Sequence, residues 1–167
     1  FAETLQSEGV FDRVDHVRVE LFGSLGATGK GHGSDLAVML GLEGELPEAV
    51  DTDAAPLRVA EIVREAKLRL LGTREIPFAL ADSLLFHRRQ TLPRHPNGMR
   101  FTATGASLAE PVVRVYYSVG GGFVVNDSDP DGPFAPDRPQ VPHHFRSGAD
   151  FIHLSLWDVN RTTKKRP

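Results

Sequence analysis

The sequence predicts an α+β fold, a single domain in which helices pack on one face of a mixed or antiparallel sheet. Helical patterns dominate the first half of the chain and strand patterns the second, without the regular strand–helix alternation of a doubly wound parallel sheet. A length of 167 residues is typical of one domain, and a hydrophobic fraction of 40% can supply one core. We therefore assign residues 1–167 to one domain, with its core at about 10–150, an exposed loop at 126–142 and a tail at 157–167.

Individual elements follow from hydrophobic periodicity and from turn residues. Alternating apolar and polar residues over His16–Phe22 predict a half-buried strand. Further strands are expected at 75–78, 83–86, 100–103, 112–117 and 123–125. A helix tail is expected to end near Gly9, and helices are expected at 36–40, at about 55–71 and at 149–156. The expected caps are Ser34 or Asp35 with Gly41, Asp51 to Asp53 with Gly72, and Ser147.

Composition excludes several classes of function. The formal net charge of −3 gives no electrostatic case for nucleic acid or for an anionic membrane surface. No apolar run approaches the roughly 20 residues that span a bilayer. The chain has no cysteine, which excludes disulfides and thiolate metal sites and fits a cytoplasmic location. The first residues lack the pattern of a signal peptide and the initiator Met, so we expect the chain to begin inside a longer protein.

A glycine-rich segment follows the first strand. Residues 23–33 hold five glycines, which predicts a loop with free backbone N–H groups between a strand and the start of a helix. Such groups beside Lys30 can bind an anion such as the carboxylate of an amino acid. A phosphate loop is excluded because Ser24 and Gly31 stand where that motif needs Gly and Ser or Thr. The alternative is a flexible surface loop whose glycines only make turns, and the residues alone leave both open.

Two histidines lie in segments that can form a site. His32 lies in the glycine-rich segment, where a histidine is usually just solvated, although Lys30 and Asp35 nearby leave a general base open as the alternative. His95 begins the turn 95–99, where the alternative is an incidental turn residue. No carboxylate at a metal-binding spacing accompanies the remaining candidates His143, His144 and His153, so no metal is predicted. Residue patterns therefore indicate a soluble α+β domain with a possible anion site, and they name no reaction.

Three strings in a fixed order carry a family resemblance. They are FGSLGATGKGH at 22–32, HPNGMRF at 95–101 and YYSVGGGFV at 116–124, with Ser34-Asp35 and Gly41-Leu42 between the first two. Together they resemble the N-terminal β domain of the iron–sulfur L-serine dehydratases, or L-serine ammonia-lyases, over roughly residues 10–150. Two departures stand out. The family's Ser-Ser-Ser-His-Thr segment is absent, and the sequence from Ile152 onward does not resemble the family.

The resemblance implies a reaction and the partners that it needs. L-serine would lose its α-proton and β-hydroxyl to give aminoacrylate, which becomes pyruvate and ammonia. In this family a 4Fe-4S cluster takes the leaving hydroxyl, and its thiolate ligands come from a C-terminal catalytic domain. This chain has no cysteine for that cluster, so the resemblance implies that domain as its partner and an inactive isolated fragment. A homodimer in the cytoplasm is also expected.

The resemblance further implies the residues of the site. His32 and His95 map onto the family's active-site histidines, with His32 the first candidate for general base or acid. The candidates for binding the substrate or another anion are Ser24, Thr28, Lys30, Gly31, Asp35 and Asn97. A competing function is also implied, because the domain resembles the regulatory domain of some phosphoglycerate dehydrogenases. Such a module binds serine or another anion, or mediates dimerisation, without catalysis. A purely structural interface domain is a third possibility.

Overall fold

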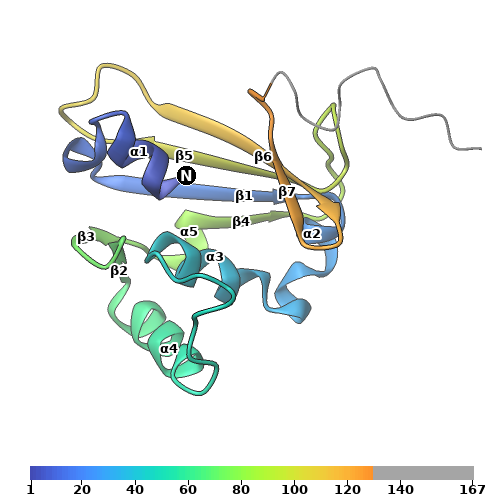
Figure 1. The fold of residues 1–167 in the computed structure, drawn as a ribbon, viewed down its shortest axis with the longest axis horizontal. Coiled ribbons are helices and arrows are strands. Elements are labelled where there is room, and N and C mark those ends of the chain that lie inside the picture. The colour runs from blue at the N-terminus through green and yellow to red at the C-terminus, as the bar shows by residue number, and fades with distance from the viewer. Residues whose placement is uncertain (130–167) are drawn as a thin grey trace, which may run out of the picture. The chain divides into compact units, whose positions relative to one another are not determined.

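A mixed five-stranded sheet forms the centre of the fold. The computed structural model describes residues 1–129, and the strand order in the sheet is β4-β1-β5-β6-β7 (Figure 1). β4 runs parallel to β1, whereas β5, β6 and β7 are each antiparallel to the preceding neighbour in the sheet. The strands are β1 (His16–Phe22), β4 (Leu84–His87), β5 (Gly98–Thr104), β6 (Val112–Gly120) and β7 (Phe123–Asn126). The predicted α+β class with a mixed sheet is confirmed, and each strand expected in this sheet is present.

Short helices and a small hairpin surround this sheet. The helices are α1 (Ala2–Ser7), α2 (Gly23–Thr28), α3 (Ser34–Leu42), α4 (Ala55–Glu65) and α5 (Leu80–Ser83), with 3₁₀ helices η1 (Phe11–Arg13) and η2 (Gly29–His32). The hairpin consists of β2 (Lys67–Leu70) and β3 (Arg74–Pro77). None of the helices within residues 1–129 is long and apolar enough to span a membrane. The helix tail expected near Gly9 is α1, after which Gly9 turns the chain at a φ of +68°.

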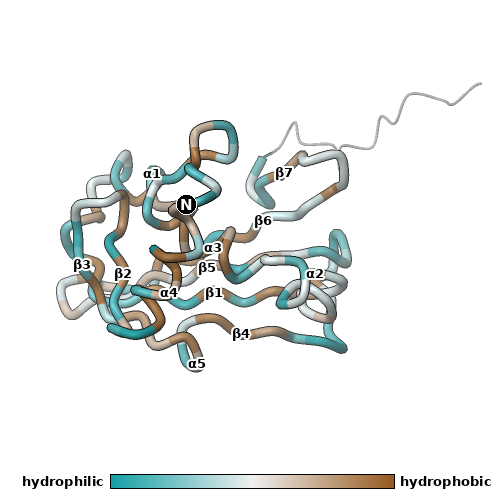
Figure 2. The backbone as a smooth tube through the Cα atoms, turned by 90° about the horizontal axis from the view of Figure 1, so that it is seen from below, coloured by the Kyte–Doolittle hydropathy of each residue, from teal (hydrophilic) through white to brown (hydrophobic). Residues whose placement is uncertain are grey.

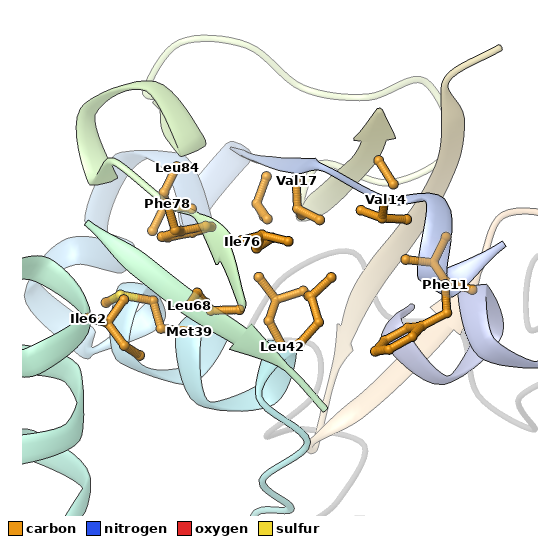
Figure 3. Close-up of a cluster of buried hydrophobic side chains, with 14 of the residues drawn as sticks. Phe11, Val14, Val17, Met39, Leu42, Ile62, Leu68, Ile76, Phe78 and Leu84 are labelled. Atoms are coloured by element: carbon orange, nitrogen blue, oxygen red, sulfur yellow. The ribbon is translucent and has the colours of Figure 1, made fainter. Parts of the chain in front are cut away.

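One face of the sheet is buried by these elements. Val17, Val19 and Leu21 alternate along β1 and are at most 2% exposed. They belong to one hydrophobic cluster with Leu5 of α1, Met39 and Leu42 of α3, Ile62 of α4, and Leu68 and Ile76 of the hairpin (Figure 3). The intervening residues Arg18 and Glu20 project to the opposite face, as the period of a strand requires. Helices therefore cover the apolar face, as the sequence pattern predicts.

The helix predicted at 55–71 is wrong in its second half. α4 ends at Glu65, Ala66 takes a left-handed φ of +51°, and β2 begins at Lys67. Leu68 and Leu70 are buried while Lys67 and Arg69 are exposed, so this stretch has the period of a strand. Figure 2 shows the same alternation of hydrophobic and hydrophilic residues along β2. Gly72 therefore closes the turn of a hairpin and does not end a helix.

The helix predicted at 36–40 is longer than expected and has a different start. α3 spans Ser34–Leu42, so Gly41 lies inside it. Gly33, at a φ of +74°, precedes it, and no side chain caps its N-terminus. The cap expected at Asp51 to Asp53 is wrong, since Ala54 is the N-cap residue of α4 and no side chain caps this helix; Asp51 Oδ1 instead accepts the N–H groups of Asp53 and Ala54 in the turn that precedes it. The helix predicted at 149–156, the 157–167 tail and most of the 126–142 loop lie outside the described residues, although Asn126 still belongs to β7.

Candidate functional site

The glycine-rich segment is helical, so the predicted loop is wrong. α2 and η2 together occupy residues 23–32 and follow β1 directly. A Cβ on Gly26 would lie 2.5 Å from the carbonyl oxygen of His87 and 2.6 Å from that of Leu21, and a Cβ on Gly23 would lie 2.0 Å from that of Pro96. These distances exclude any side chain. Gly23 and Gly26 are therefore required because α2 lies directly against the backbone of neighbouring segments. The spacing of three residues between Gly23, Gly26 and Gly29 is the sequence feature that indicates a helix here.

The start of α2 is bound to the turn that precedes β5. The Oδ1 atom of Asn97 accepts the Ser24 backbone N–H at 3.0 Å and the Ser24 hydroxyl at 2.7 Å. The N–H of Gly23 donates to the carbonyl oxygen of Gln90 at 2.8 Å. These N–H groups were expected to be free for an anion, and that expectation is wrong because neighbouring segments already use them. Ser24 and Asn97, predicted from separate motifs, are in direct contact.

A stripe along the helical run continues from Ser24 to His32. Ser24, Thr28 and His32 are four residues apart, which places them on one side of a helix. The Thr28 hydroxyl donates to the Ser24 carbonyl at 3.0 Å, and the Nδ1 atom of His32 lies 2.9 Å from the Thr28 carbonyl oxygen. All three residues are exposed. The stripe therefore leads from the Asn97 contact to an exposed imidazole.

His95 joins the same site from the other side of Asn97. Its Nδ1 atom accepts the backbone N–H of Asn97 at 3.2 Å, so Asn97 contacts Ser24 through its side chain and His95 through its backbone. The His95 ring meets the Tyr117 ring edge-on, with 6.4 Å between centroids. Burial raises the pKa of the Tyr117 hydroxyl, and the charge of Asp127 adds to that effect. The site thus lies at the end of the sheet where β5 begins and β6 ends.

The remaining predicted site residues, Lys30, Gly31 and Asp35, have no hydrogen bond to Ser24, Asn97 or the two histidine side chains within residues 1–129. Lys30 and Gly31 are exposed in η2, and among the described residues the Lys30 ammonium has no hydrogen bond or ion pair. The carboxylate of Asp35 is half-buried and accepts the N–H of Leu36 at 3.0 Å at the start of α3. A role in anion binding remains a prediction for these three residues. His143, His144 and His153 lie outside the described residues.

Sequence reasoning missed an ionic cluster on the opposite face of the sheet. The Glu20 carboxylate accepts two hydrogen bonds from the Arg100 guanidinium, at 2.6 and 2.9 Å, and lies 2.9 Å from His87 Nε2. The Arg100 hydrogen bond lowers the pKa of Glu20 against the opposing effect of burial. His87 stacks on Phe22 with 4.6 Å between ring centroids. Only the register that places Glu20 opposite Arg100 could have revealed this cluster.

Comparison with known proteins identifies the family. A family model described as the serine dehydratase beta chain matches residues 1–129. The chain belongs to this family. It is 47% identical over 157 residues to an L-serine dehydratase of Streptomyces coelicolor, and 36% identical over 155 residues to L-serine dehydratase TdcG of Escherichia coli. These alignments cover 93% and 92% of the chain but 34% of each relative, so the chain spans about a third of their length.

A further relative of the serine dehydratase beta chain family is an L-serine dehydratase of Mycobacterium bovis. It is 43% identical over 127 residues, which are 76% of this chain and 27% of the relative. The Streptomyces alignment, at 157 residues, extends beyond the 10–150 resemblance that the motifs predict. The predicted family is therefore confirmed over most of the chain, and the three motif strings that predicted it include His32 and His95.

This serine dehydratase beta chain does not fit an iron–sulfur cluster. The chain has no cysteine to supply the thiolates that hold such clusters. Among residues 1–129, no group of three or more His, Asp or Glu side chains could hold a metal ion. His32 and His95 each direct Nδ1 at a backbone group. What the described residues show at this site is a set of hydrogen bonds that joins the two histidine motifs.

Proposed function

We propose that this chain is the β domain of an L-serine dehydratase, which converts L-serine to pyruvate and ammonia. In this proposal the domain supplies His32 and His95 for proton abstraction and substrate binding, and a separate domain supplies the iron–sulfur cluster. The observation that carries the proposal is the continuous set of hydrogen bonds from His95 through Asn97, Ser24 and Thr28 to His32. It joins two motifs that are distant in sequence, within a family whose relatives are L-serine dehydratases.

The surroundings of the two histidines suit this chemistry. A general base must come within about 3 Å of the proton that it removes, which requires an accessible ring nitrogen. His32 is exposed on η2. The nearby Lys30 ammonium, which is unpaired within residues 1–129, is a suitable partner for the serine carboxylate. Because His32 and Lys30 are exposed, a cluster-bearing domain could bring its own groups to them.

The decisive experiment measures turnover in the full-length parent. We would prepare it anaerobically with His32→Ala and His95→Ala and assay pyruvate formation from L-serine. We expect each variant to lower kcat by about 100-fold or more while the cluster absorbance is unchanged, because a general acid–base group contributes at least that much. His16→Ala is the matched control, since His16 is exposed at the opposite end of β1.

The same assay tests the regulatory function. If both variants keep a normal kcat and only the dependence of rate on serine concentration changes, the domain is a regulatory module and the proposed catalytic role is wrong. The 167-residue chain alone should form no pyruvate from L-serine at any concentration, because it cannot hold the cluster. Mixing it with a separately expressed cluster domain is the complementary measurement, and activity in the mixture would show that the two parts assemble.

A further inference from the structure

α2 packs against the ends of two neighbouring strands, β1 and β4 (Figure 1). A Cβ on Gly26 would lie 2.6 Å from the Leu21 carbonyl oxygen of β1 and 2.5 Å from the His87 carbonyl oxygen of β4. A second contact follows β4, where the Gln90 carbonyl accepts the Gly23 N–H at 2.8 Å. An isolated helix of 6 residues is not stable in water, so the position of α2 depends on these two strand ends.

The sheet holds the two strand ends differently. β1 lies inside the sheet, with β4 on one side and β5 on the other. β4 is an edge strand of 4 residues, and among the described strands it pairs with β1 alone. The backbone of an edge strand lacks hydrogen-bonded neighbours on one side. A side chain that anchors His87, the last residue of β4, therefore adds a restraint that the sheet does not give.

The His87 side chain is such an anchor, on the face of the sheet opposite the hydrophobic cluster. Its Nε2 atom lies 2.9 Å from Glu20 Oε1, and its ring stacks on Phe22 with 4.6 Å between centroids. Since an ionised carboxylate can only accept, Nε2 of His87 is the donor. Glu20 is itself held by two hydrogen bonds from Arg100, whose guanidinium lies 5.3 Å from the centre of the Phe22 ring. Side chains thus join β4, β1 and β5.

We propose that His87 is a positioning residue, whose imidazole, bound to Glu20 and Phe22, fixes the end of β4 and through it the place of α2. Its backbone carbonyl meets Gly26 with no side chain between them. Closely packed interiors compress little and so transmit displacements, which means that a shift of this strand end would move α2. The consequence for turnover rests on the function proposed above, whereas the effect on α2 does not.

α2 carries part of the candidate site. Ser24 lies in its first turn, in contact with Asn97, and His32 follows at the end of η2. Within residues 1–129 the His87 ring has no hydrogen bond to these three residues, so its effect on them would be indirect. Displacement of a reacting group by about 1 Å can cost about 100-fold in rate. A small shift of α2 is therefore enough to affect turnover.

Two amide substitutions separate the anchor from ordinary packing. His87→Gln places an amide nitrogen near the position of Nε2, from which it can donate to Glu20. His87→Asn is one methylene shorter and places its amide nitrogen near the position of Nδ1, away from Glu20. His16→Asn is the matched control, because His16 lies on the same face of β1 and its ring has no hydrogen bond within residues 1–129.

Hydrogen exchange of the 167-residue chain measures the restraint on α2. The reporters are the amides of Gly23 and Gly29, which are both hydrogen-bonded. We expect His87→Asn to accelerate their exchange at least about 10-fold relative to the amide of Ala103 in β5, because a hydrogen bond to a charged group is lost. His87→Gln and His16→Asn should change this ratio by less than about 3-fold. Equal acceleration of all three amides in His87→Asn, or no acceleration, would overturn the inference.

A second variant acts on the other partner of the hydrogen bond. Glu20→Gln removes the charged acceptor and keeps the His87 ring on Phe22. We expect the same selective acceleration of the Gly23 and Gly29 amides, by about 5-fold or more. This variant decides the question if His87→Asn does not fold, and uniform exchange in Glu20→Gln would then overturn the inference.

Turnover by the full-length parent tests the consequence for the site. At a temperature where each variant is fully folded, we expect His87→Asn to lower kcat by about 10-fold or more and His87→Gln to keep it within about 3-fold of the parent. A merely structural role would lower the denaturation midpoint of His87→Asn and leave its kcat unchanged. That result would overturn the positioning role.

Failure of this inference and failure of the proposed function give different results. Selective exchange in His87→Asn together with normal kcat in His32→Ala and His95→Ala would support the hold on α2 and refute the proposed function. Inactive alanine variants together with normal kcat in His87→Asn would support the proposed function and refute this inference. Hydrogen exchange does not depend on the cluster, so loss of the cluster during preparation does not affect that measurement.

Discussion

Different forces hold two regions of the molecule in place. One region is the apolar face of the sheet with the elements that cover it, and the other is the end of the sheet where α2 lies against backbone. On the apolar face, Leu68, Ile76 and Phe78 are at most 2% exposed and contact each other through side chains. At the glycine-rich end, Gly23 and Gly26 allow backbone to touch backbone, and directed hydrogen bonds fix the contact. The hydrophobic effect has no preferred direction, so it tolerates small shifts of the buried side chains. Hydrogen bonds depend on distance and angle, so small shifts of the donor or acceptor weaken them. The first region therefore supplies stability and the second supplies precise positions.

The largest expected effect tests the apolar face. Phe78→Ala removes a ring that is 0% exposed, so we expect the free energy of unfolding to fall by about 3–5 kcal/mol. Chemical denaturation of the purified chain measures this, with Leu57→Ala as the control because Leu57 is 75% exposed. Equal losses in the two variants would show that Phe78 does not belong to a packed core.

A smaller effect is expected where the helix lies against backbone. Gly26→Ala places a methyl group 2.5–2.6 Å from two carbonyl oxygens, and we expect a loss of about 1–3 kcal/mol in the free energy of unfolding. Gly31→Ala is the matched control, since nothing lies within 4 Å of its Cβ position. Denaturation midpoints of both variants give the comparison. If Gly26→Ala is as stable as Gly31→Ala, the close packing of α2 on the strands is wrong.

The ionic cluster on the opposite face should respond to pH. Because the Arg100 hydrogen bond holds the pKa of Glu20 below its usual range, the stabilisation is present at neutral pH and lost as the pH falls below about 4.5. Glu20→Gln should lower the free energy of unfolding at pH 7 by roughly 1–3 kcal/mol, since it removes the charged acceptor. Its difference from the parent should shrink in acid. Glu48→Gln, at an exposed position, should change neither quantity.

The smallest expected effect on stability lies in the site itself. Asn97→Ala removes the acceptor of two hydrogen bonds from Ser24, and we expect a loss of about 1 kcal/mol. Ser24→Ala keeps the backbone donor and should lose about half as much. Kinetics of the full-length parent should show a larger fall in kcat for Asn97→Ala than its stability suggests, because His95 loses its alignment. Unchanged kcat would separate Asn97 from the active site.

Several residues named for the candidate site contact each other, whereas the local structure that carries them differs from the prediction. Ser24, Asn97 and the two histidines were named from separate motifs, and the structure joins them. The segment that carries Ser24 and His32 was predicted as a loop, because five glycines oppose a helix in isolation. Contacts with the backbone of Leu21, His87 and Pro96 reverse that preference. His87 and Pro96 are distant from these glycines in the sequence, so a local pattern does not reveal the contacts. The reversal of 67–70 from helix to strand has the same origin, in burial against α3 and α4.

The sequence by itself determined the fold class, the family and the strands of the main sheet. Alternation along β1 and the apolar run of β6 specify strands directly, since side-chain burial follows a period of two. Only the tertiary structure decided where the glycines pack, which carboxylate meets Arg100, and which backbone group faces the Nδ1 atom of each histidine. Each of these depends on a partner brought close by folding, and a local pattern contains no information about that partner.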